Sequence, residues 1–177
     1  AMAMACIQTR EELNMSAIGK MTLSKDKVPK PGQRDQSTKA SMRKDKEGLG
    51  TYYWADGSVY TGDWHDNKIN GTGQYKWKDG REYYGSWKNN DMDGMGIYIY
   101  TDGVTYEGQY KDDKKTGYGL YYWTDGRKYE GWWYKGKQHG LGIYKDPTKN
   151  KVKYGLWEIG QRRSWFNEQT IYQINNN

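Results

Sequence analysis

One segment of the chain, residues 83–103, reads YYGSWKNNDMDGMGIYIYTDG. Its framework is Tyr-x-Gly-x-Trp, six further residues, Gly-x-Gly-x-Tyr and a final Gly. The framework occurs four times, after a half copy that begins at Gly48 and before a degenerate copy that begins at Gly155. A fixed step of this kind is the signature of a repeat architecture. The glycines of the leading motif follow one another at intervals of 23 residues and are Gly62, Gly85, Gly108 and Gly131.

The framework predicts that each repeat is a β-hairpin. Its marked residues alternate along the chain, which is the two-residue period of a strand and not the longer period of a helix. Asp-Gly pairs such as Asp79-Gly80 predict tight turns between repeats, because glycine accepts a positive φ angle. The loop inside each repeat is expected to hold six residues, as at 65–70.

The position of the tight turn also predicts a strand register. A three-residue turn that closes on Lys78 and Glu82 would pair Tyr75 with Gly85. Rings would then lie over strand glycines, and each glycine would form a slot for a ring from a neighbouring strand.

The composition predicts a thin structure. Leu, Ile, Val and Phe together number only 20 of the 177 residues, whereas the chain has 9 Trp, 18 Tyr and 23 Gly. So few aliphatic side chains cannot fill a core between two layers. Rings and backbone hydrogen bonds must therefore supply the stability, and a catalytic α/β domain is disfavoured.

The repeat resembles that of the MORN (membrane occupation and recognition nexus) family, whose hairpins carry Tyr-x-Gly-x-Trp and Gly-x-Gly at these spacings. The resemblance covers residues 48–157. It implies an all-β fold, an elongated single-layer antiparallel β meander of repeated hairpins with an aromatic stripe along one face. Two positions depart from the pattern: Tyr110 replaces the usual Trp, and Lys153 stands where the last copy needs Tyr. We expect that last unit to be a cap.

Three regions are expected along the chain. Residues 1–46 form a basic leader with ten Lys or Arg against five acids, and a capping box predicts a short helix over about residues 10–18. Residues 47–163 form the repeat sheet. Residues 164–177 form a C-terminal capping segment with a short helix, entered through a closing strand at 162–166.

The single cysteine, Cys6, bears on the compartment. It has no partner for a disulfide within the chain, which suits a reducing cytoplasm. No apolar stretch is long enough to span a bilayer. We expect a cytoplasmic protein, and the family resemblance implies a cytoskeletal, ciliary or peripheral membrane location.

No catalytic, metal or cofactor site follows from the residue spacing. His65 and His139 are the only histidines and occupy different positions in their repeats, so they form neither a metal site nor a catalytic triad. Residues 89–94 imitate the start of a calcium loop, but Tyr100 stands where that loop needs Glu. Basic residues are not interleaved with the rings, which disfavours nucleic acid. We expect no enzyme, no cofactor and no bound metal.

The aromatic stripe is the predicted functional surface. Tyr and Trp anchor interfaces because they bury much area and lose little rotamer entropy. Equivalent rings at a fixed step suit a helical or extended segment of a protein partner, which predicts a scaffold or adaptor. Any single ring could instead serve only to pack the sheet against its glycines. The predicted partner-binding rings are Tyr60, Trp64, Tyr83, Trp87, Tyr106, Tyr110, Tyr129, Trp133 and Trp157.

The other face of the sheet becomes apolar toward the C-terminus. Thr72 and Gln74 in the first copy give way to Ile97 in the second and to Leu120 in the third. A single layer cannot bury this face, so we expect the termini, a second copy in a homodimer, or another partner to cover it.

The alternative function is a module that binds anionic phospholipid and tethers a membrane, or the targeting region of a larger protein. It rests on the basic residues of the leader and of the C-terminal end, which an anionic surface would attract. A solvated connector is the plainer interpretation of the leader. The predicted lipid contacts are Lys39, Arg43, Lys44, Lys46, Lys151, Lys153, Arg162 and Arg163.

Overall fold

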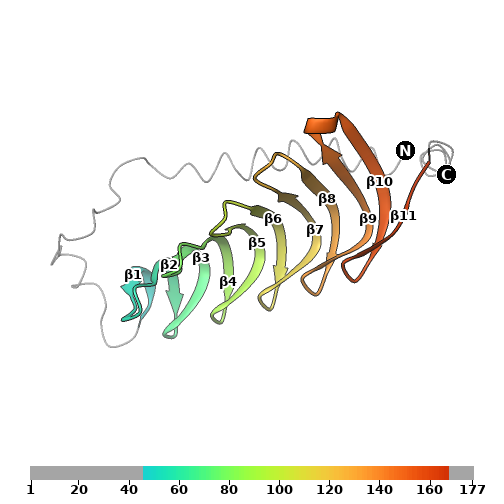
Figure 1. Cartoon of the computed structure of the whole chain (residues 1–177). Coiled ribbons are helices and arrows are strands. Elements are labelled where there is room, and N and C mark those ends of the chain that lie inside the picture. The colour runs from blue at the N-terminus through green and yellow to red at the C-terminus, as the bar shows by residue number, and fades with distance from the viewer. Residues whose placement is uncertain (1–45, 168–177) are drawn as a thin grey trace. The chain divides into compact units, whose positions relative to one another are not determined.

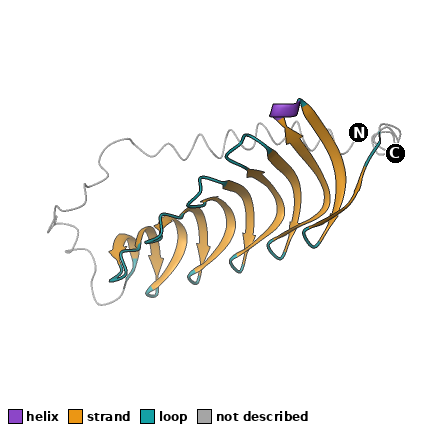
Figure 2. Ribbon diagram, in the orientation of Figure 1, coloured by secondary structure: helices purple, strands orange, loops and turns teal. Residues whose placement is uncertain are grey.

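A computed structural model describes residues 46–167. Its strands form one open sheet of 11 antiparallel strands whose spatial order is their order in the sequence (Figure 1). The strands are β1 (Gly48–Tyr53), β2 (Val59–His65), β3 (Lys68–Lys76), β4 (Glu82–Lys88), β5 (Asp91–Ile99), β6 (Thr105–Lys111), β7 (Lys114–Tyr122), β8 (Lys128–Tyr134), β9 (Lys137–Asp146), β10 (Lys151–Glu158) and β11 (Gln161–Trp165). Between β9 and β10 lies the short 3-10 helix η2 (Pro147–Lys149), the helical element in Figure 2. The predicted all-β single-layer meander is therefore confirmed.

The hairpin inside each repeat closes with a two-residue turn, so the predicted six-residue loop is wrong. Only Asp66 and Asn67 separate β2 from β3, and both are left-handed, with φ of 48° and 63°. Asp and Asn tolerate this conformation, which a type I′ turn requires. A β-bulge after Gly62 accommodates the remaining length. Equivalent left-handed pairs are Asn89-Asn90, Asp112-Asp113, Lys135-Gly136 and Ile159-Gly160.

The turns between repeats contain three residues, as predicted, but they close one position earlier. The Trp77 N–H donates to the Arg81 carbonyl at 2.9 Å, so the turn closes on this pair and not on Lys78 and Glu82. Gly80, with φ of 92°, is the last residue of the turn. A three-residue turn requires a positive φ angle at its third residue. Because Gly80 meets this requirement, the turn closes on Trp77 and Arg81.

The resulting register places glycine opposite glycine and tyrosine opposite tyrosine. Tyr75 pairs with Tyr83, and Gly73 pairs with Gly85. The predicted pairing of Tyr75 with Gly85 is therefore wrong by two residues. Because neither glycine of a pair has a Cβ atom, each pair leaves a bare strip across two strands.

A tyrosine ring covers each bare strip. The ring of Tyr83 folds over Gly85 on its own strand and over Gly96 on the next, and a Cβ atom on Gly96 would overlap it. The Tyr83 hydroxyl donates to the Ser86 carbonyl at 3.0 Å. The predicted packing of rings over glycines is thus confirmed, although each ring comes from the same hairpin. The covering tyrosines, each 0% exposed, are Tyr60, Tyr83, Tyr106 and Tyr129.

The opposite face is more apolar on the later strands than on β3, as the sequence predicts, but Leu49 and Tyr53 on β1 are also exposed there, at 77% and 64%. At the β1 end the hydroxyls of Thr51 and Thr61 lie 3.0 Å apart in a hydrogen bond. On β8 and β9, Trp132 and Leu141 are 52% and 46% exposed. The predicted cover by the chain termini concerns residues outside the described range.

The sheet continues past the expected border at residue 163. β11 ends at Trp165, close to the predicted closing strand, because its residues complete the pairing with β10. The helix predicted at 10–18 lies outside the described residues, and so does nearly all of the predicted terminal helix. None of the helices within residues 46–167 is long and apolar enough to span a membrane.

Gly96→Ala should destabilise the sheet more than Gly80→Ala. A Cβ atom at Gly96 would overlap the Tyr83 ring, and we expect a loss of at least about 3 kcal/mol from overpacking. Gly80 has open space around it, so alanine there meets only the left-handed backbone cost of about 1 kcal/mol. Urea unfolding of both variants checks this, and a smaller loss for Gly96→Ala would contradict the ring packing.

Candidate partner-binding face

The nine predicted partner-binding rings lie on one face of the sheet, where they form its core. Tyr83 and Trp87 meet edge to face, with centroids 5.0 Å apart and an angle of 87°. Tyr60 contacts Trp87 of the next repeat at 5.7 Å. A single layer packs these rings against one another, so little of each ring remains accessible. The members of this buried tier, 0% to 7% exposed, are Tyr60, Trp64, Tyr83, Trp87, Tyr106, Tyr110, Tyr129, Trp133 and Trp157.

Most polar atoms of the buried tier form hydrogen bonds to the backbone of the sheet. The indole N–H groups of Trp64 and Trp133 donate to the carbonyls of Gly50 and Gly119, each at 3.2 Å. Tyr110 replaces the tryptophan in the third repeat, and its buried hydroxyl has no hydrogen-bond partner among the described residues. Burial raises the pKa of Tyr110 far above its usual value.

A second tier of rings forms the accessible part of the same face. Trp77 follows the Gly-x-Gly-x-Tyr motif by two residues and stacks on Tyr75, with centroids 4.6 Å apart. Sequence reasoning missed these rings because it used only the two glycine motifs, although Trp54, Trp77, Tyr100 and Trp123 recur at steps of 23 residues. The outer rings, all partly buried, are Tyr52, Trp54, Tyr75, Trp77, Tyr100, Tyr121, Trp123, Tyr144 and Trp165.

The outer rings border a groove of about 590 Å³ in the N-terminal half of this aromatic face. Its polar groups are held in place by hydrogen bonds: the Asp113 carboxylate accepts from the Met92 N–H at 2.8 Å, and the Asn90 side chain accepts from the Ile69 N–H at 2.9 Å. The groove therefore offers an apolar interior and a fixed polar rim. Its lining consists of Trp54, Ile69, Tyr75, Trp77, Arg81, Trp87, Asn90, Met92, Tyr98 and Asp113.

Lys115 projects onto the aromatic face one repeat beyond the groove. It occupies on β7 the repeat position that holds Ile69, Met92 and Gln138 in other copies. Burial lowers the pKa of its amine to about 8. The sequence analysis did not identify Lys115 as a candidate binding residue. The rings whose centroids lie 4.7 to 5.0 Å from the amine are Tyr100, Tyr106, Tyr121 and Trp133.

The five predicted lipid-contact residues within the described range do not form one patch. Lys46 precedes β1 and lies over an outer ring there at 3.5 Å. At the other end of the strand order, Lys153 and Arg162 lie 5.0 and 4.6 Å from the centroid of Trp165 (Figure 1). Arg163 pairs with a carboxylate on β10 at 2.7 Å.

Lys151 lines a separate small hollow of about 260 Å³ beside η2. Lys128 and Lys145 line the same hollow, together with Asp146. Sequence reasoning did not connect these lysines, because they come from β8, β9 and β10. Outside the described residues lie Lys39, Arg43 and Lys44.

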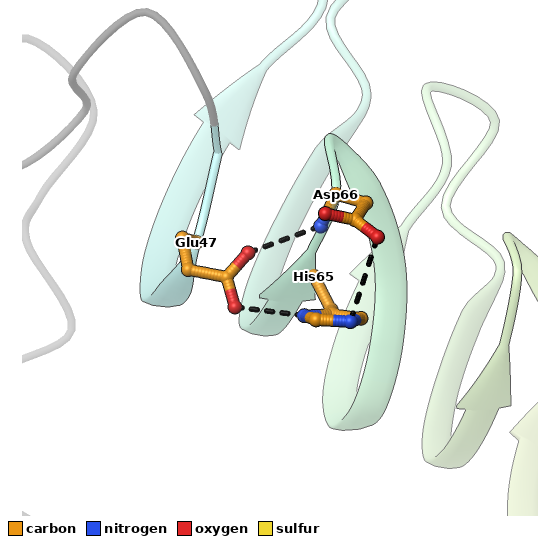
Figure 3. A group of neighbouring side chains, drawn as sticks. All are labelled: Glu47, His65 and Asp66. Carbon is orange, nitrogen blue, oxygen red and sulfur yellow. Dashed lines mark hydrogen bonds and ion pairs between the residues drawn. The ribbon is translucent and has the colours of Figure 1, made fainter.

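Three potential metal ligands meet at the β1 end of the sheet (Figure 3). His65 Nδ1 lies 2.7 Å from a Glu47 oxygen, and His65 Nε2 lies 3.5 Å from an Asp66 oxygen. The hydrogen bond between His65 and Glu47 raises the pKa of His65 and lowers the pKa of Glu47. A metal ligand must be a neutral imidazole, whereas this environment favours imidazolium. An exposed ion pair therefore accounts for the cluster.

The fold and the two ring tiers define a β-hairpin repeat protein with one accessible aromatic face. Comparison with known families matches the MORN repeat at five consecutive segments, residues 41–59, 60–80, 83–105, 106–126 and 129–151. These matches cover more than half of the chain, which therefore belongs to the MORN repeat family. Such repeats are generally associated with protein and membrane interaction, and their proteins are typically non-catalytic scaffolds. A comparison with curated proteins finds no match.

Stability should rise between about pH 7.5 and about pH 9.5 because of Lys115. The folded pKa of about 8 lies below the ordinary value, so in this range the unfolded chain binds more protons than the folded chain. Lys115 alone should contribute a gain of about 2 kcal/mol over this range. Above the ordinary tyrosine pKa the trend should reverse, because burial raises the folded pKa of Tyr60, Tyr83 and Tyr106.

Lys115→Met is the matched control for this pH dependence, since Met92 occupies the same position one repeat earlier. The variant should be more stable than the wild type near neutral pH and should lose the rise. Urea unfolding at the two pH values measures both effects. An identical rise in the variant would show that another group is responsible.

Proposed function

We propose that this chain is a non-catalytic scaffold or adaptor that binds a helical or extended segment of a protein partner along its aromatic face. The observation that carries the proposal is the groove of about 590 Å³ bordered by outer rings. Trp, Tyr, Met and Arg, the residue types enriched in interface cores, dominate its lining. The assemblies that suit such an adaptor are cytoskeletal, ciliary or membrane-associated, in the cytoplasm.

The buried tier and the outer rings have different roles on the aromatic face. The buried tier gives the sheet its stiffness, because its rings are fixed by their neighbours and most of them also by a backbone hydrogen bond. The outer rings meet the partner on that rigid support, so little side-chain entropy is lost on binding. The nine buried rings predicted from the sequence therefore contribute to partner binding mainly by holding the outer rings in position.

The repeat step favours an elongated ligand over a compact one. Equivalent outer rings such as Trp54 and Trp77 lie two strands apart, which is roughly 10 Å. A helix or an extended strand can place side chains on several such positions at once. The binding energy should be concentrated at the rings in the middle of the groove, foremost Trp77.

A membrane-tethering module remains the second candidate, and the Trp165 site favours it. There two cations, Lys153 and Arg162, lie against an outer ring, a combination suited to an anionic lipid interface. Binding to anionic vesicles that about 0.5 M salt abolishes would support this candidate. The apolar opposite face offers a further surface, for a second copy of the chain.

Trp77→Ala should weaken partner binding while Trp132→Ala should not. Peptides selected from a displayed library on the full chain provide the ligand, and titration calorimetry gives the affinity. We expect Trp77→Ala to cost about 2 kcal/mol, or about 30-fold. Trp132 is the matched control because it is an exposed tryptophan on the opposite face. Loss of affinity with Trp132→Ala alone would place the partner on the other face.

A further inference from the structure

The third repeat differs from its neighbours at two positions that face each other. Tyr110 and Lys115 are cross-strand partners in the β6–β7 hairpin. The equivalent partners are Trp64 with Ile69 and Trp87 with Met92 in the two preceding repeats. An apolar pair is thus replaced by a hydroxyl and an amine at one point of an otherwise regular face.

Neither polar group has a polar partner in the described part of the chain. The Tyr110 side chain is 4% exposed, and its hydroxyl forms no hydrogen bond. The Lys115 amine is held by ring faces alone, and no carboxylate in residues 46–167 forms an ion pair with it. Burial of the charge lowers the pKa of this amine, and within residues 46–167 only ring faces offset that cost.

Two acidic residues in turns flanking β6 are engaged in backbone hydrogen bonds. Asp113 accepts from the Met92 N–H at 2.8 Å, and Asp102 accepts from the Val104 N–H at 3.1 Å. These bonds hold both carboxylates in their turns. An anionic group of a ligand would therefore complement the Lys115 charge.

We propose that the third repeat contains a carboxylate-binding subsite, in which the Lys115 ammonium receives an acidic side chain of the partner segment between the rings of Tyr100, Tyr121 and Trp133. The inference rests on the proposed function of the aromatic face and specifies its partner. Ring walls exclude water around the ion pair, which strengthens a charge-assisted hydrogen bond.

The repeat step then predicts the spacing of the partner sequence. Lys115 lies one repeat beyond Met92, a lining residue of the groove, and one repeat spans two strands, or roughly 10 Å. An extended segment covers this distance in about three residues, and a helix in about seven. The partner should carry an acidic residue at one of these separations from an apolar anchor.

Phenylacetate and its neutral isostere phenylacetamide test the subsite directly. In the full chain with 13C-labelled lysine, phenylacetate should shift the Lys115 side-chain signals saturably, with an affinity at least about fivefold above that of phenylacetamide. It should also raise the pKa of the Lys115 amine. Lys115→Met should abolish the preference, whereas Lys114→Met, at an exposed neighbour, should keep it. Melting of Lys115→Met at or above the wild-type temperature shows that the sheet is intact.

Three results would overturn the subsite: no saturable shift at Lys115, equal affinity for the two compounds, or a preference that survives in Lys115→Met. Tighter binding of inorganic phosphate than of phenylacetate would overturn the assignment to a carboxylate. If phenylacetate does not bind at Lys115 but peptides still bind in a Trp77-dependent way, the subsite is wrong and the partner-binding face stands. If phenylacetate binds at Lys115 but no peptide binds in a Trp77-dependent way, the peptide function is wrong and an anion site stands.

Discussion

Every repeat of this sheet depends on one contact, a tyrosine ring that lies across two glycines on neighbouring strands. A single layer has no second layer to cover its apolar surface, and the ring supplies that cover from within the hairpin. Tyr83 closes over Gly85 and Gly96 and donates its hydroxyl to the backbone. Trp87 and Tyr110 then pack edge to face against it from its own repeat and from the next. The chain can therefore build a stable fold with very few aliphatic residues.

This contact also separates stability from recognition on the aromatic face. The rings that cover the glycines are fully buried, so their hydroxyls and edges are engaged within the sheet. Outer rings such as Trp77 rest on that layer and border the groove. Since the outer rings do not close the glycine strips, they can differ between repeats without loss of the fold, as Trp77 and Tyr100 do. Lys115 is the strongest local variation of the face, because it introduces charge at a position that is uncharged in the neighbouring repeats.

The sequence was sufficient to predict the architecture but not the depth at which each ring lies. The 23-residue step and the alternation of glycine and aromatic residues predicted the antiparallel meander and the packing of rings on glycines. The predicted strand register was wrong because the position of Gly80 within its turn determines which residues pair. Moving each end of the turn by one residue changes the cross-strand partner of Tyr75 by two residues. Alternation places Tyr60 and Tyr75 on the same face and cannot distinguish the buried ring from the partly exposed one. Contacts between separate strands, such as Glu47 with His65, leave no signal in spacing.

A double-mutant cycle between Tyr129 and Gly142 tests the central contact most directly. A Cβ atom on Gly142 would lie 2.6 Å from the Tyr129 hydroxyl oxygen, so Gly142→Ala should cost at least about 2 kcal/mol in the wild-type chain. In a Tyr129→Ala background the ring is gone and the same change should cost less than about 0.5 kcal/mol. Urea unfolding of the four proteins gives the coupling energy. Additive losses would contradict the account, because they would mean that the glycine is not required by the ring above it.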